Sequence, residues 1–102
     1  MAWATAGVLG SPAAGTILAD SGTLTASMFS FTIIIVTQYA ARVAIVLRDA
    51  TNTTDVMTQL FKTQSDEPTA ISEFNFLVGL NQRLVLRAES DMIGEVQASL
   101  LW

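Results

Sequence analysis

The stretch DATNTTD holds the residues of this chain that come closest to a cation site. Asp49, Asn52 and Asp55 carry carboxylate or amide oxygens, which are the ligands that calcium prefers in proteins. The stretch lacks the central glycine and the terminal glutamate of an EF-hand loop. We therefore interpret it as a solvated loop and predict no metal and no cofactor. The triplet Asn52–Thr54 also matches a glycosylation sequon, a pattern that is common by chance.

Five further carboxylates could act as general acids or bases if two of them shared a site. Asp66 and Glu67 are adjacent, so their side chains point apart on an extended chain. Glu89 and Asp91 could share a face, with Glu73 across the sheet. The chain has no His and no Cys to form the usual nucleophile–base pairs. We predict that the acidic residues solvate the rim of the fold and that the protein is not an enzyme.

The composition indicates one small domain that does not bind nucleic acid. Of the 102 residues, 51% are hydrophobic and 14% are charged, and the net charge is −4. Binding to a phosphate backbone needs a basic surface, and this chain has five cationic residues. The start MAWATAGVLGSPAAG has neither a positive region nor a sustained apolar run, so no signal peptide is predicted.

The apolar run from Phe29 to Leu47 raises the question of whether the chain crosses a membrane. Its mean hydropathy of roughly 1.8 is high enough for a membrane helix. Its apolar residues alternate with period two on either side of TQYAAR, and they are β-branched or aromatic, as is typical of strands. Gln38 and Arg42 would lie near the bilayer midplane, where arginine costs roughly 2.5–3.5 kcal/mol. We predict two strands joined by a short link, and no membrane contact.

The remaining segments show the same alternation. Strands are expected at 16–20, 56–64, 70–78, 83–89 and 95–102, with turns at 20–22, 65–68 and 79–82. Seven or eight strands without a helix predict an all-β fold, an antiparallel sandwich or barrel. Trp102 is expected to close one end of it, with stacking on a ligand as the alternative. The residues expected to form the core between two sheets are Phe31, Ile33, Ile45, Phe76 and Leu86.

The second face of the first two long strands is apolar where a small sandwich should be polar. One interpretation is that these residues fill small gaps in the protein's own core. We favour a surface that neighbouring copies of the chain cover in a homo-oligomer. The residues expected at this interface are Met28, Ile34, Val36 and Val46, with Ala44 on the same face.

The first fourteen residues are uncharged and rich in Ala and Gly, whereas a free tail is usually polar. Glycines and one proline are expected to keep this segment out of regular structure. We predict an extended N-terminal arm at 1–14 and a β-sandwich domain at 15–102. The arm residues expected to bind a partner are Trp3, Val8, Leu9 and Pro12.

Three segments together resemble a group of small all-β virion proteins of tailed bacteriophages. They are AGTILADSGTLTASMFSFTIIIV (14–36), VLRDATN (46–52) and NQRLVLRAESDMIGEVQASL (81–100). In that group a turn like LLADSG precedes a long alternating strand, and a hairpin that ends in a Q-A-S-I pattern closes the chain. This sequence has Asp49 and Gln82 where the group more typically has Asn and Glu.

The resemblance implies a jelly-roll-like antiparallel β-sandwich that decorates or cements a capsid. The implied partners are the major capsid protein and further copies of the chain, and a homotrimer suits the threefold positions of an icosahedral shell. The implied location is the capsid surface of the virion, after assembly in the host cytoplasm. No catalytic residue and no small-molecule substrate carry over. The alternatives are a head fibre base, a tail component, or a carbohydrate-binding β-sandwich.

Overall fold

The computed structural model describes residues 2–24, 27–39, 42–49, 54–62, 69–79 and 81–102. Within these ranges the chain forms strands and no helix, so none of its described segments is a helix that could span a membrane. The all-β fold predicted from period-two alternation is confirmed. The nine strands are β1 Trp3–Thr5, β2 Leu9–Gly10, β3 Ile17–Asp20, β4 Ser27–Thr37, β5 Arg42–Arg48, β6 Asp55–Lys62, β7 Thr69–Val78, β8 Arg83–Ala88 and β9 Glu95–Leu101.

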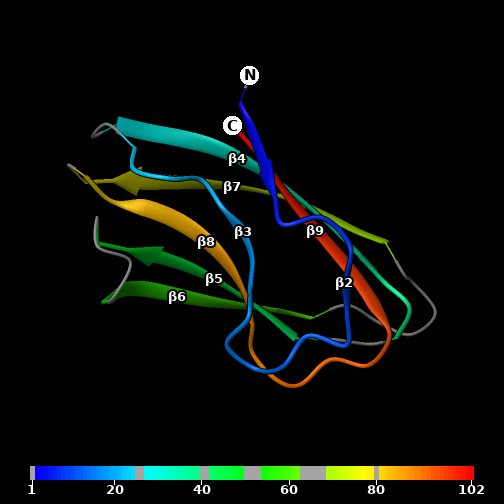
Figure 1. Cartoon of the computed structure of the whole chain (residues 1–102). Helices are drawn as coiled ribbons and strands as arrows, with labels where there is room; N and C mark the ends of the chain where they lie inside the picture. The colour runs from blue at the N-terminus through cyan, green and yellow to red at the C-terminus, as the bar shows by residue number, and fades with distance from the viewer. Residues whose placement is uncertain (1, 25–26, 40–41, 50–53, 63–68, 80) are drawn as a thin grey trace.

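The strands form two antiparallel sheets that pack against each other (Figure 1). The first sheet has the order β1-β9-β4-β7, with β2 also paired to β9, and the second has the order β3-β8-β5-β6. Four sets of pairs are nested along the chain: β5 with β6, β4 with β7, β3 with β8, and β1 and β2 with β9. The chain is therefore one long antiparallel hairpin that folds over on itself. The pairs β4–β9 and β5–β8 then join its two halves within each sheet.

Alternate residues of the long strands fill the space between the sheets. Successive side chains on a strand point to opposite faces, so a strand in the sandwich contributes every second residue to the core. Four of the predicted core residues are confirmed: Phe31, Ile33, Ile45 and Leu86 are at most 1% exposed. The side chain of the fifth, Phe76, lies outside the described part of the structure. Other core positions are Ile35 in β4, Val43 and Leu47 in β5, Leu84 in β8, and Val96, Ala98 and Leu100 in β9.

The C-terminal residue closes one end of the core, as predicted. Trp102 is half-buried and packs against the core cluster. Its ring centroid lies 6.1 Å from that of Phe31, with the two ring planes tilted by 45°, an arrangement within the range that aromatic pairs favour. Ligand stacking is therefore not needed to explain this side chain.

The first fourteen residues differ from the expected irregular arm, because they add two short strands, so the described part of the chain has nine strands where seven or eight were expected. The segments Trp3–Thr5 and Leu9–Gly10 pair with β9. Ala2 and Trp102 also exchange two backbone hydrogen bonds, of 2.8 and 3.0 Å, so the two ends of the chain lie side by side (Figure 1). The cause is the edge of β9, whose N–H and C=O groups need partners. Gly7, with φ of 81°, interrupts the pairing without preventing it.

The turn before β9 connects three parts of the chain. The Gly94 N–H donates to the Ser11 hydroxyl at 3.2 Å, and the Gly94 carbonyl accepts from the Ser11 N–H at 2.8 Å. On the other side, the Glu95 N–H donates to the Gln38 side-chain oxygen at 2.8 Å. Gly94 has φ of 79°, and a Cβ atom here would collide with the Gln38 side chain and lie 3.1 Å from the ring of Tyr39. Only glycine fits this position without a shift of its neighbours.

We expect Ile33→Ala to lower the free energy of unfolding by about 2–5 kcal/mol, because Ile33 is 1% exposed in the core and its truncation leaves a cavity. The matched control is Ile93→Ala, since Ile93 is 72% exposed in the turn before β9 and should cost less than about 0.5 kcal/mol. Urea unfolding of both variants measures the difference. Equal losses would mean that β4 presents the wrong face to the core.

Three glycine-to-alanine variants should separate backbone strain from collision. Gly10→Ala has a permitted φ and open space, so its effect should stay within about 0.5 kcal/mol. Gly22→Ala has open space but φ of 73°, which costs about 1–3 kcal/mol. Gly94→Ala adds the collision with Gln38 and should be the least stable of the three. Thermal unfolding that ranks Gly94→Ala with Gly10→Ala would contradict the turn geometry described above.

Candidate interaction surface

The two sheets differ in charge. Every cationic residue of the chain lies in the second sheet, whose strands hold five cations and two anions, for a sum of +3. The strands of the first sheet hold two charged residues, Glu73 and Glu95, for a sum of −2. The cations are Arg42 and Arg48 in β5, Lys62 in β6, and Arg83 and Arg87 in β8. Charge is thus segregated between the two outer faces of the sandwich, although it looks scattered along the sequence.

Ion pairs cover the outer face of the second sheet. Asp55 Oδ1 lies 3.0 Å from Arg48 Nε, and Asp55 Oδ2 lies 3.1 Å from Arg87 Nη1. Asp20 Oδ2 lies 3.0 Å from Arg83 Nη1. These pairs are partly exposed, so each adds little to stability, but arginine stems also cover apolar surface.

Val46 lies beneath this charged layer. It is fully buried on the face of β5 that points away from the core, opposite Val85 of β8, which is buried as well. Arg48 in β5 and Arg83 and Arg87 in β8 flank this pair at the next positions of the same face. The apolar residues of this face are therefore already buried within a single chain.

The outer face of the first sheet is apolar and exposed. The strand registers place its side chains in rows across β9, β4 and β7. In one row Trp3 lies beside Leu101, and in the next Ile34 lies beside Ile71. Val8 and Val36 line a hollow of about 160 Å³ together with Gln97. We call this surface the apolar outer face and define it by Trp3, Val8, Ile34, Val36, Ile71, Leu77 and Leu101.

Exposure shows which residues of this face could contact a partner. Trp3, Ile71 and Leu77 are 67%, 65% and 74% exposed, and Val8 and Val36 are exposed as well. Ile34 and Leu101 are half-buried between their neighbours. Polar residues, such as Thr32, Gln97 and Ser99, lie between them in the same rows. Exposed apolar residues rimmed by polar ones mark interaction sites in soluble proteins.

The four residues predicted at the oligomer interface do not lie together. Ile34 and Val36 belong to the apolar outer face, and the side chain of Met28 lies outside the described part. Val46 lies on the opposite side of the sandwich and is buried. The prediction of one surface was wrong for Val46, because β4 and β5 follow each other in sequence but enter different sheets.

The four arm residues also divide into two groups. Trp3 and Val8 are exposed on the apolar outer face, as a docking role requires. Leu9 is half-buried and packs against the core cluster, and Pro12 is buried. Leu9 and Pro12 were expected to bind a partner, whereas pairing of Leu9 with Val96 turns the Leu9 side chain toward the core of its own chain.

Ile71 and Leu77 are exposed apolar residues of this face that sequence reasoning missed. Both share a parity with Glu73 and Asn75 along β7, so they point away from the core. The same alternation that identified the strand could have shown this. Their apolar character did not suggest exposure. The position of β7 at the edge of the first sheet, which depends on the pairing of distant strands, leaves them uncovered.

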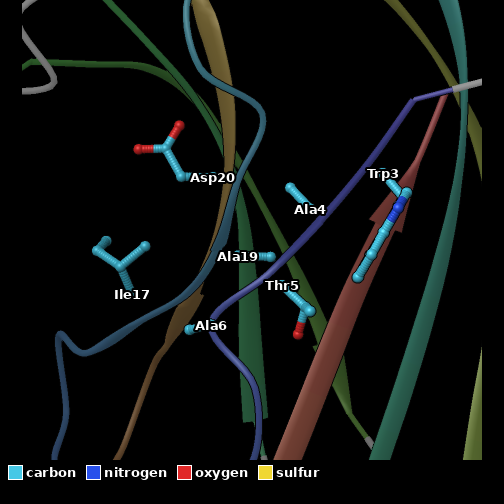
Figure 2. Close-up of a pocket in the computed structure, with 7 residues that line it drawn as sticks. All are labelled: Trp3, Ala4, Thr5, Ala6, Ile17, Ala19 and Asp20. Atoms are coloured by element: carbon cyan, nitrogen blue, oxygen red, sulfur yellow. The ribbon is translucent and has the colours of Figure 1, made fainter.

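A groove of about 340 Å³ opens between the edge strands β1 and β3 (Figure 2). Ala4 and Ala19 lie between the two backbones, whereas Ile17 and Asp20 lie on the far side of β3. The Ala6 N–H donates to the Leu18 carbonyl at 2.9 Å and ties the strands together at one end of the groove. The lining is small and mainly apolar, with one carboxylate that already pairs with Arg83. Such a groove suits an apolar side chain better than a catalytic centre.

The residues considered for metal binding and catalysis form no common site within the described ranges. Asp55 is held by two arginines, and Asp49 accepts a hydrogen bond from the Thr54 N–H at 3.2 Å, whereas Asn52 lies outside the described residues. Asp91 accepts a hydrogen bond from the Ala14 N–H at 2.8 Å. In these ranges no three acidic, His or Cys residues gather into a metal-binding group.

The remaining acidic candidates do not change this description. Glu73 lies in the first sheet, whereas Glu89 follows β8 of the second sheet. Asp66 and Glu67 lie outside the described residues. The surface with the strongest structural signal is therefore the apolar outer face.

Comparison with known proteins adds no family to this description. No protein-family model matches the chain, and no curated protein matches it at a significant level.

The different placement of Trp3 and Leu9 gives a direct test of the arm. We expect Leu9→Ala to lower the free energy of unfolding by about 1–2 kcal/mol, because part of its side chain is removed from water. Trp3→Ser should change stability by less than about 0.5 kcal/mol, because the side chain is mainly exposed. Chemical unfolding measures both. A Leu9→Ala variant as stable as the parent would show that the arm does not pack on the core in solution.

Proposed function

We propose that the protein is a jelly-roll structural component of a tailed-phage virion, which decorates and stabilises the capsid by binding the major capsid protein. The nested strand pairs support the jelly roll, because two Greek keys arise when a long antiparallel hairpin rolls up. If β1 and β2 are counted as one interrupted edge strand, the strands number eight, four in each sheet. Jelly rolls serve in viral capsid and lectin domains, so the function must be argued from the surface.

The observation that carries the proposal is the apolar outer face. Its residues come from β1, β4, β7 and β9 and from Val8 just before β2, and none of them is a cation. A protein whose role is to bury one face against a large assembly needs such a surface, whereas a monomer in water gains nothing from it. Each side chain that is fully removed from water stabilises the contact by about 1.5–3 kcal/mol before the costs of association.

The mechanism of such a protein is mechanical. Bound subunits stabilise the assembled shell by mass action, because they bind the closed shell and not its separated subunits. The charged outer face of the second sheet would then point to solvent, where its ion pairs keep the particle surface hydrated. A head fibre base or a tail component would use the same two faces in the same way.

Self-association belongs to the same proposal. The homotrimer expected from the sequence stays a prediction. Of the residues predicted at its interface, Ile34 and Val36 remain candidates, whereas Val46 does not. Both lie on the apolar outer face, so a trimer contact there would compete with the shell contact for the same surface.

A carbohydrate-binding function would use exposed aromatic residues on one platform. Trp3 and Tyr39 are exposed, but they lie near opposite ends of β9. Trp3 pairs with Leu101, whereas the Tyr39 ring lies beside Gly94. These two residues therefore do not form one platform, and the capsid proposal is the better supported of the two.

The proposal is tested on particles of the phage that encodes the chain. We expect the protein to sediment with purified heads, and we expect Val36→Asp to weaken its rebinding to stripped heads by at least tenfold, because a carboxylate would be buried in the contact. The matched control is Val56→Asp, since Val56 is similarly exposed but belongs to the second sheet. The control should rebind normally.

Two results would contradict this assignment. Absence of the protein from purified heads would refute a capsid location. Equal rebinding of Val36→Asp and Val56→Asp would place the shell contact elsewhere than on the apolar outer face.

A further inference from the structure

β7 is a long edge strand without the usual protection. It spans ten residues and, in the described part of the chain, pairs with β4 alone. An edge of this kind presents a row of N–H and C=O groups that can template another strand, and proteins normally protect it with Lys, Pro or short length. β7 (yellow-green in Figure 1) contains no Pro and no cation, and Glu73 is its single charge.

The other sheet edges show the protection that β7 lacks. The edge strands β1, β2 and β3 have two to four residues each. The remaining edge, β6, carries Asp55 at its first position and Lys62 at its last. Of the sheet edges in the described part of the chain, β7 is therefore the longest, and it has neither a Lys nor a Pro to oppose pairing with another strand.

The outward residues of β7 have the same pattern in both chain directions. They are Ile71, Glu73, Asn75 and Leu77, which read apolar, polar, polar, apolar. All four are exposed on the face that points away from the core. A palindromic pattern of this kind is complementary to a second copy of itself in antiparallel orientation, since a twofold axis exchanges the two halves.

Register decides whether that complementarity is used. In an antiparallel strand pair, the numbers of any two facing residues add to the same sum. That sum must be even for outward residues of one copy to face outward residues of the other, because a slip of one residue turns the side chains to the other face. A sum of 146 places Glu73 against Glu73 of the other copy, and sums of 144 and 150 place Glu73 against an apolar residue. A sum of 148 pairs Ile71 with Leu77 (71 + 77) and Glu73 with Asn75 (73 + 75).

We propose that two copies of the chain pair through β7 in antiparallel orientation, with the twofold axis at Phe74. In this register positions 70–78 of one copy lie along positions 78–70 of the other. The row formed by Ile34 and Ile71 in one copy continues into Leu77 of the second copy, so the two exposed apolar side chains of β7 pack against each other across the copies. The first sheets of both copies form one continuous sheet, and the inference does not depend on the capsid function.

Cysteine cross-linking tests the register directly, because the native chain contains no Cys. An Ile71→Cys chain mixed with a size-tagged Leu77→Cys chain should form a mixed disulfide on mild oxidation. Each variant alone should form little, since like positions lie about 20 Å apart along the strands. A mixed Glu73→Cys and Asn75→Cys pair should also cross-link.

The outcomes that would overturn the proposal are equally specific. Self-cross-linking of Glu73→Cys in preference to the mixed pair would show a different register. Absence of all these cross-links, with a monomer or a trimer by sedimentation equilibrium, would show that β7 does not pair with itself. In that case a strand of another protein, or none, covers this edge.

A charge series provides a second test that does not need oxidation. Asn75→Lys would face Glu73 of the other copy, and we expect it to tighten the dimer several-fold, because opposite charges directly across an antiparallel pair attract. Asn75→Glu should weaken the dimer by a similar factor. The matched controls are Gln97→Lys and Gln97→Glu, since Gln97 is exposed on the same outer face but lies in β9, away from the edge. Equal changes at both positions would indicate a net-charge effect and overturn the proposed pairing.

Discussion

The rest of the structure depends on the alternation of side chains along β4. This eleven-residue strand pairs with β7 along one edge and with β9 along the other. It therefore lies inside the first sheet, and its two faces point to the core and to the outside. One parity, with Phe31, Ile33 and Ile35, fills the centre of the core. The other parity, with Ile34 and Val36, forms the middle of the apolar outer face. The core and the apolar outer face are thus built on opposite sides of the same backbone, because successive side chains of a pleated strand point to opposite faces.

Segregation of charge gives the sandwich two chemically different faces. Arginines in β5 and β8 flank the buried pair Val46 and Val85 and form ion pairs with Asp20 and Asp55. The first sheet has no cation and leaves large apolar side chains exposed. Because the two faces lie on opposite sides of the molecule, a partner that excludes water from one leaves the other hydrated. In the proposed function, this difference between the faces would orient the subunit on the shell without any specific charge contact.

The N-terminal segment serves the fold and the surface together. Its backbone pairs with the edge of β9, and Leu9 packs on the core, whereas Trp3 and Val8 remain exposed. The protein therefore does not separate an inert domain from a free docking arm. Removal of this segment would uncover β9 and would also take Trp3 and Val8 out of the apolar outer face, so the fold and this surface are physically coupled.

Much of this protein follows from local pattern alone. Period-two alternation, β-branched residues and the turns at 20–22 and 79–82 determined that the chain forms strands, where most of them begin and end, and that Phe31, Ile33, Ile45 and Leu86 point inward. These are properties of the pleat and of a few neighbouring residues. The tertiary structure decided which strand lies beside which. It placed Val36 and Val46 on opposite sides of the sandwich, attached the first residues to β9, and left Ile71 and Leu77 uncovered. Those outcomes depend on contacts between distant segments, such as the Thr5 hydroxyl that donates to the Ala98 carbonyl 93 residues away, and alternation within a strand carries no information about its partner.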